Sequence, residues 1–164
     1  MTLLNTDNIK EEITVTDTDI VSMADGVLCD IADVGDPVFS QSIMGESAAF
    51  SYEDDTVTIC SPANGILSVL YPNGHAFGIT MKDETELLIH IGVDTNDAKG
   101  DGFTVLGKKQ GDIVKAGEPI VEVDMEKLSK IYDMPVMLIV TNSKDHPVKF
   151  IEPCTVKKGQ KINI

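Results

Sequence analysis

Arginine is absent from this sequence: all 13 cationic residues are lysines, against 27 carboxylates, and the formal net charge is −14. Binding to nucleic acid requires a basic patch that displaces counterions from phosphates, so this composition argues against a nucleic-acid partner. The absence also limits the chemistry of the chain, because without a guanidinium it has no bidentate clamp for a phosphoryl group. A protein partner would have to supply one.

Long apolar runs and paired cysteines are lacking as well. The purest apolar stretch, VMLIV at residues 136–140, is far shorter than the roughly 18 residues of a membrane-spanning helix, and no signal peptide is visible. Cys29, Cys60 and Cys154 are isolated and form neither a C-x-x-C pair nor a zinc spacing. We therefore expect a cytoplasmic protein with free thiols in a reducing compartment.

What is present has the size and pattern of one all-β domain. Residues 1–18 are polar and acidic without a convincing apolar period, which predicts a flexible N-terminal tail. From residue 19 to 164, short runs rich in Val, Ile, Leu and Thr alternate with turn signals about every ten residues. We also expect one or two short helices, at residues 124–131 and 40–44.

A weak internal repeat suggests how the strands are organised. Residues 22–28 (SMADGVL) resemble residues 61–67 (SPANGIL), and both read as a tight turn that leads into an aliphatic strand. The repeat favours a sandwich built from two related strand motifs, although coincidence is an alternative explanation.

Two of the three histidines lie in strand-like segments that flank one turn. His75 is in PNGHAFGI and His90 is in ELLIHIGVDT, and a two-residue turn at Lys82-Asp83 would place them directly opposite each other. Directly opposed residues have Cβ atoms about 4.5–5.5 Å apart. Alternation puts His75, Phe77 and Ile79 on one face of the first strand. On the second strand it groups Leu88, His90, Gly92 and Asp94, with Leu87, Ile89, Ile91 and Val93 toward the core.

Paired imidazoles suit phosphoryl transfer. A neutral imidazole is a good nucleophile near pH 7, and a neighbouring imidazole can donate a hydrogen bond to a phosphoryl oxygen. The competing use is zinc binding, but zinc needs further protein ligands, and neither H-x-H nor H-E-x-x-H is present. We expect no required cofactor or metal, and only weak zinc binding at His75 and His90 that a partner carboxylate would strengthen.

The segments around these histidines resemble the glucose-type enzyme IIA of the bacterial sugar phosphotransferase system. The resemblance covers residues 19–164, in the family's order, through the following segments: DPVFS (36–40), MG (44–45), SPANG (61–65), HAFGI (75–79), ELLIHIGVDT (86–95), KGDGF (99–103), GDIVKAGEPI (111–120) and PVMLIVTN (135–142). It implies a flattened antiparallel β-sandwich. The Met1 and the acidic tail of the chain lead us to expect a free subunit, although the sugar and any link to a larger transporter stay open.

The resemblance also implies roles for individual residues. His90 would accept a phosphoryl group from the histidine phosphocarrier HPr and donate it to a cysteine of a IIB domain, and His75 would stabilise the group. Supporting roles fall to Asn73, where the family usually has Thr, and to Gly92. Partner binding falls to the following residues: Asp36, Val38, Phe39, Phe77 and Asp94. Further regulatory protein targets are also consistent with the family, and the resemblance implies that the chain meets a membrane only through the transporter.

Other functions fit parts of the chain. GDIVKAGEPIVEV resembles a strand pattern of biotinyl and lipoyl carrier domains, but the expected exposed lysine motif is missing around Lys127. A metallopeptidase-like sandwich is opposed by the absence of H-x-H, and a purely regulatory binding domain by the two intact histidines. We interpret His146, in a turn before Pro147, as a surface residue.

Overall fold

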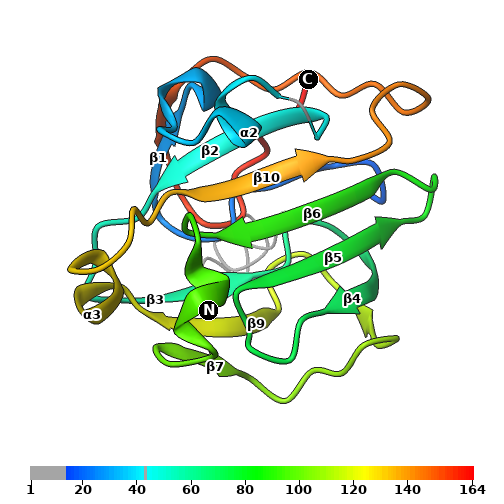
Figure 1. Ribbon diagram of the computed structural model, residues 1–164. Helices are drawn as coiled ribbons and strands as arrows, with labels where there is room; N and C mark the ends of the chain where they lie inside the picture. Colours follow the sequence, from blue (N-terminus) through cyan, green and yellow to red (C-terminus); the bar gives the residue numbers. More distant parts are fainter. Residues whose placement is uncertain (1–13, 43) are drawn as a thin grey trace, which may run out of the picture.

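The strands of this protein form two antiparallel sheets. The computed structural model describes residues 14–42 and 44–164 (Figure 1). Within these residues the larger sheet has eight strands in the order β11-β1-β2-β10-β6-β5-β4-β8, and the smaller one has three in the order β3-β9-β7. The strands are β1 (Gly26–Cys29), β2 (Glu46–Ser51), β3 (Thr56–Cys60), β4 (Gly65–Leu70), β5 (Ala76–Met81), β6 (Glu86–Ile91), β7 (Phe103–Val105), β8 (Ile113–Val114), β9 (Pro119–Asp124), β10 (Val136–Val140) and β11 (Cys154–Val156). The expected all-β antiparallel sandwich is confirmed.

The main core lies on the inner face of the large sheet, and alternation along β6 shows how it forms. Leu87, Ile89 and Ile91 are at most 2% exposed and belong to this core, while Leu88 and His90 between them are half-buried. Successive side chains of a strand point to opposite faces, so the pattern LLIHI places three aliphatic side chains inward. The alternation predicted for this strand is confirmed.

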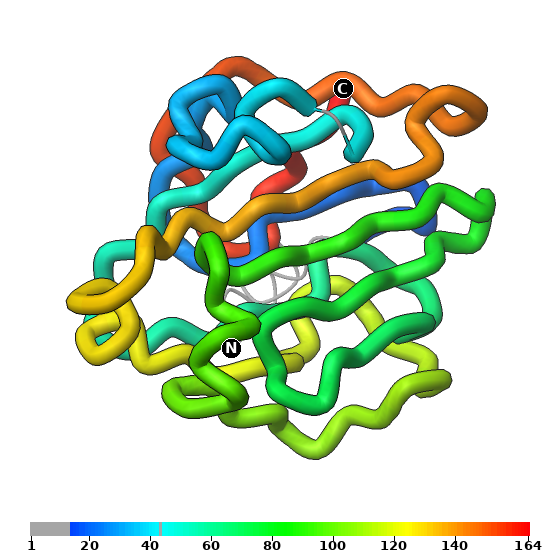
Figure 2. Tube along the Cα trace, viewed as in Figure 1, coloured from blue at the N-terminus to red at the C-terminus, as the bar shows by residue number. Residues whose placement is uncertain are grey.

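Strand β10 is buried on both faces, which explains why VMLIV is the most apolar run of the chain. Val136, Leu138 and Val140 belong to the main core. Met137 and Ile139 pack on the other face, in a second cluster with Val34 and Phe39. Residues 30–42 therefore cover the outer face of the sheet over β2 and β10, as the light blue segment in Figure 2 shows.

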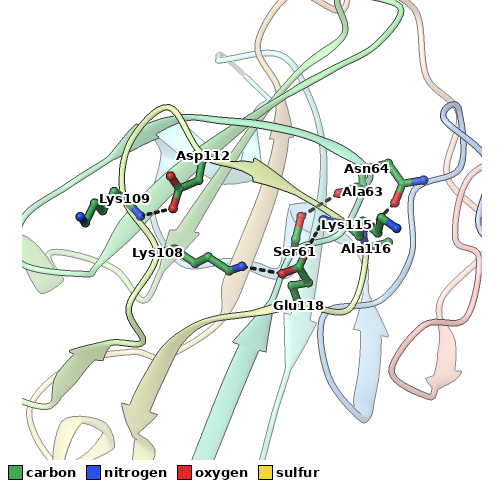
Figure 3. Close-up of polar contacts among 9 residues, drawn as sticks. All are labelled: Ser61, Ala63, Asn64, Lys108, Lys109, Asp112, Lys115, Ala116 and Glu118. Atoms are coloured by element: carbon green, nitrogen blue, oxygen red, sulfur yellow. Dashed lines mark hydrogen bonds and ion pairs between the residues drawn. The ribbon is translucent and has the colours of Figure 1, made fainter.

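The internal repeat is real, and its two copies are built alike. Ser22 Oγ donates to the Ala24 carbonyl (2.8 Å), as Ser61 Oγ does to Ala63 (2.7 Å). Asp25 accepts a hydrogen bond from the Lys158 backbone N–H, and Asn64 accepts one from Ala116. Figure 3 shows the second copy. The strand order of the large sheet also reads as two mirrored halves, because β1 and β4 each lie between an edge strand and an inner strand.

The helices are short, and one lies earlier than expected. Helix α3 (Met125–Ser129) begins after Asp124, whose carboxylate accepts a hydrogen bond from the Lys127 N–H, as predicted. The prediction of a helical turn at residues 40–44 was wrong. Helix α2 (Pro37–Ser40) begins one turn earlier because Asp36 caps it and Pro37 suits its first position. Two 3₁₀ turns, η1 (Ile31–Asp33) and η2 (Thr95–Ala98), are also present.

The predicted register between β5 and β6 was wrong by one residue. The loop has three residues rather than two, because Glu84 adopts a left-handed conformation (φ 72°) and Met81 N–H donates to the Thr85 carbonyl. His90 therefore pairs with Ala76, and Phe77 pairs with Ile89. Phe77 and Ile79 consequently point into the core and do not share a face with the histidines.

The N-terminal tail is described only in part. Residues 1–13 lie outside the described residues. The Val15 carbonyl accepts a hydrogen bond from Asn64, and the Thr18 carbonyl accepts one from Asn163. The last part of the predicted tail is thus bonded to the domain. Among the described residues, no helix has both the length and the apolar character that a membrane crossing requires.

Candidate active site

His90 lies at the end of β6, near the middle of the large sheet. Its backbone pairs with Met137 of β10 on one side and Ala76 of β5 on the other. Its ring is half-buried and packs against Phe39 of α2, with ring centroids 5.2 Å apart. The imidazole therefore lies at the boundary between the covered and the open part of the outer face.

The protonation of His90 follows from its hydrogen bond. Nδ1 lies 2.8 Å from the carbonyl oxygen of Gly92. A carbonyl oxygen can only accept, so Nδ1 must carry the proton, and the neutral ring then has its lone pair on Nε2. A lone pair on a half-buried nitrogen is what a nucleophilic histidine needs.

Gly92 can hold its carbonyl in this position only because it has no side chain. Its φ is +77°, and an added Cβ would lie 2.5 Å from Thr95 Cγ2 and 2.7 Å from Met134 Sδ. Any other residue would be strained in its backbone and would also collide with buried neighbours.

His75 lies beside His90, although not as its direct cross-strand partner. It precedes β5 and follows Gly74 (φ 85°), and its carbonyl accepts a hydrogen bond from the Ile91 N–H. The two imidazole centroids are 5.6 Å apart with nearly perpendicular rings. The expectation that the two histidines meet is confirmed, but they meet through the turn before β5.

Burial affects the titration of both rings. Burial lowers the pKa of His75, and the His90 imidazole lowers it further. Burial also lowers the pKa of His90, while the Gly92 carbonyl and the carboxylates of Asp36 and Asp94 partly oppose this. Both rings are therefore held in the neutral form near pH 7.

Three of the predicted partner-binding residues lie close to His90, and a fourth, Val38, belongs to the same helix α2 as Phe39. Asp36 caps α2 and Asp94 precedes η2, and both carboxylates are close enough to act on the imidazole. Val38 is 45% exposed, whereas Phe39 is only 8% exposed and mainly supports the ring. Whether these residues bind a partner stays a prediction.

Phe77 was wrongly assigned to this surface. It is 0% exposed and lies in the main core, because the true register points it inward. Asn73 is half-buried near Gly100, and it does not bond to His75 Nδ1, which is buried without a hydrogen-bond partner among the described residues. The role expected for Asn73 stays a prediction.

Two residues of the site were not predicted. The ring of Tyr71 meets His75 edge to face, with centroids 5.1 Å apart, and Tyr71 is 43% exposed. Thr95 is 0% exposed, and its hydroxyl donates to the Ile91 carbonyl. Tyr71 could have been suspected as an aromatic residue before the PNG turn, but no pattern in the sequence marks the buried hydroxyl of Thr95.

The geometry also bears on the alternatives. Within the described part of the chain, no three His, Cys, Asp or Glu side chains converge as a metal site, so zinc would find only the two imidazoles. Lys127 lies in α3, where its ammonium bonds to Asp101 (2.7 Å), and not at the tip of a hairpin. The biotinyl or lipoyl alternative is therefore not supported.

Comparisons with known proteins identify the family to which this chain is similar. Residues 18–146 match the family described as phosphoenolpyruvate-dependent sugar phosphotransferase system, EIIA 1. The glucose-specific EIIA component of Halalkalibacterium halodurans is 37% identical over 131 residues, covering 80% of this chain and 74% of that protein. A glucose-specific EIICBA component of Staphylococcus carnosus is 34% identical over 138 residues, covering 84% of this chain but only 20% of that protein.

A solved structure, glucose permease IIA from Mycoplasma capricolum, has the same fold. It superposes with a TM-score of 0.80 at 28% identity, covering 88% of this chain and 93% of that one. The chain spans about a fifth of the length of the Staphylococcus carnosus relative. The family match over most of the chain and the shared fold establish that this protein belongs to the EIIA 1 family of the phosphoenolpyruvate-dependent sugar phosphotransferase system.

Proposed function

We propose that this chain is a cytoplasmic phosphocarrier that accepts a phosphoryl group on Nε2 of His90 and passes it on for sugar uptake. The observation that carries the proposal is the hydrogen bond from His90 Nδ1 to the Gly92 carbonyl, which leaves a lone pair on Nε2 beside a second imidazole. The step forms an Nε2–P bond as the P–N bond of phospho-HPr breaks. In the next step the Nε2–P bond breaks as a cysteine thiolate of a IIB domain forms a P–S bond.

His75 would stabilise the transferred group. Its Nδ1 is buried without a partner among residues 14–42 and 44–164, and a buried N–H without an acceptor is costly, so we assign its proton to Nε2. From there it can donate to a phosphoryl oxygen. No cofactor is needed for these steps, because phosphoryl transfer depends mainly on positioning and charge stabilisation.

The partners that we propose are supported by the charge of the chain and by the names of its relatives. The chain has no arginine and a net charge of −14, so cations for the phosphoryl group and the acidic rim would come from HPr and the IIB domain. Some relatives are named EIICBA or EIIBCA components, which supports a IIB and IIC transporter as the acceptor.

The test is phosphoryl labelling from phosphoenolpyruvate with enzyme I and HPr, followed by a chase with a IIB domain. His90→Gln should accept no label, because it lacks the bonding atom. His75→Gln should accept label on His90 but pass it on poorly, with a loss of up to about 3–4 kcal/mol in transition-state stabilisation. The matched control is His146→Gln on the surface turn, which should behave as wild type.

Two results would contradict these assignments. Stable label on His75 in the His90→Gln protein would exchange the two roles. Failure of the His75→Gln protein to accept any label would mean that the pair acts as one unit.

A further inference from the structure

Strand β6 ends one residue after His90, and the turn that follows is anchored from one side by residues 133–135. The Gly92 N–H donates to the Pro135 carbonyl (2.8 Å), and the Val93 N–H donates to the Asp133 carbonyl (2.9 Å). These bonds fix the two peptide groups on either side of Gly92 along one edge. The first of these planar groups also carries the Ile91 carbonyl, and the second carries the Gly92 carbonyl.

Thr95 anchors the turn from the other side. Its side chain is 0% exposed, and its hydroxyl donates to the Ile91 carbonyl, four residues back. Its methyl group packs directly under Gly92, where an added Cβ would come within 2.5 Å of it. One side chain thus contacts both residues that follow His90.

We infer that Thr95 is a positioning residue for His90: its hydroxyl holds the turn so that the Gly92 carbonyl stays aligned with Nδ1. The proton then remains on Nδ1, and Nε2 stays free to accept a phosphoryl group. The effect on phosphoryl acceptance rests on the proposed function, but the protonation of His90 itself can be tested without any transfer reaction.

The Gly92 carbonyl needs this support because the backbone of a glycine is conformationally free. Gly92 has no side chain to restrict its backbone, so its carbonyl direction depends on the groups that bond to its neighbours. Without the Thr95 hydroxyl, the peptide group that carries the Ile91 carbonyl keeps only the bond from the Gly92 N–H to Pro135 among the described residues. A tilt of this group changes the direction of the next carbonyl, at Gly92. Nδ1 would then lose its acceptor, and the imidazole proton could move to Nε2 and block the nucleophile.

The experiment compares Thr95→Ser with Thr95→Ala in the full chain. Both variants lose the methyl group, so they differ only in the hydroxyl. Thr85→Ala, at the opposite end of β6, is the matched control, because Thr85 is also a buried threonine (4% exposed). The tautomer of His90 is measured from the ¹⁵N chemical shifts of its ring, and acceptance of label from phospho-HPr is measured alongside.

We expect the Nδ1–H form in wild type, Thr95→Ser and Thr85→Ala, and a substantial fraction of the Nε2–H form in Thr95→Ala. Acceptance of label should fall roughly tenfold in Thr95→Ala alone, as loss of one hydrogen bond suggests. An unchanged tautomer in Thr95→Ala, or an equal shift in Thr95→Ser, would overturn the inference. So would global unfolding of Thr95→Ala, because the hydroxyl would then serve folding as a whole. If wild type shows the Nδ1–H form but accepts no label, the proposed function fails and the positioning role stands.

Discussion

At the scale of single residues, the two histidines differ in what their nitrogens contact. Within the described part of the chain, Nδ1 of His90 bonds to a carbonyl, whereas Nδ1 of His75 is buried without a partner. In both residues burial favours the neutral form of the imidazole ring. Both properties favour a nucleophile that needs no general base at neutral pH.

The lowered pKa values predict how the histidines titrate. In the folded protein both imidazoles should have midpoints below 6.5, and in concentrated urea both should return to about 6.5. Between the folded and unfolded midpoints the unfolded chain binds more protons, so the free energy of unfolding should rise with pH in that interval and level off above it. The measurement is an NMR titration of the ring protons. A midpoint for His90 above 6.5 would show that the Gly92 carbonyl and the carboxylates of Asp36 and Asp94 together outweigh burial.

A second residue-scale prediction concerns zinc. The bond from His90 Nδ1 to a carbonyl is the arrangement that orients a zinc-binding histidine, so Nε2 is available to the metal. With only two imidazoles converging among the described residues, the isolated protein should nevertheless bind zinc weakly. Calorimetry should detect weak binding that His75→Gln or His90→Gln abolishes and His146→Gln preserves. Tight binding by the isolated wild-type chain would instead favour a metalloprotein.

At the scale of elements, the duplicated turns are the local structures that join the two halves of the fold. The Val21 N–H donates to the Pro62 carbonyl, and the Cys60 N–H donates to the Met23 carbonyl. Each copy therefore contacts the other, in addition to bonding its own buried serine. The two copies share few residues in sequence, but they make equivalent hydrogen bonds in the structure.

This arrangement predicts coupled stability effects. Ser22→Ala and Ser61→Ala should each lower the free energy of unfolding by about 1–3 kcal/mol, because each leaves a buried carbonyl without its donor. The double variant should deviate from additivity by at least about 0.5 kcal/mol, because the motifs are in contact. Urea unfolding measures all three, with Ser129→Ala in α3 as an exposed control. Strict additivity would mean that the two turns act independently.

For strands β5 and β6, the sequence predicted the faces of one strand correctly but not the register between the two. Alternation identified the faces of β6 because its pattern is regular. The register of the β5–β6 hairpin was missed because it depends on Glu84 adopting a left-handed conformation, and nothing in a glutamate indicates this. The one-residue shift moved Phe77 into the core. The histidines still meet because His75 precedes the strand, where pairing rules no longer fix its side chain.

At the scale of the whole molecule, the large sheet offers one covered and one open half. Residues 30–42 pack over β2 and β10, while Val69 and Tyr71, at the end of β4 and just after it, are 39% and 43% exposed. The two histidines lie where the halves meet. A partner that docks on the open half would therefore reach His90 beside the carboxylates of Asp36 and Asp94.

Charge steering is the prediction that belongs to this scale. Asp36→Asn and Asp94→Asn should each slow phosphoryl acceptance from a basic donor, because a net charge of −14 and two carboxylates at the site attract it. Both substitutions leave the backbone intact. Asparagine can still accept the Val38 N–H as a helix cap, and it tolerates the left-handed conformation of Asp94 (φ 60°).

The control is Glu152→Gln, which removes the same charge from the exposed segment before β11 and should change the rate little. Stopped-flow transfer rates measured over a salt series should converge as salt rises, because exposed charges are screened within about 10 Å at 0.1 M. A rate ratio that stays constant with salt would assign these carboxylates a contact role in the docked complex, since attraction at a distance cannot survive screening.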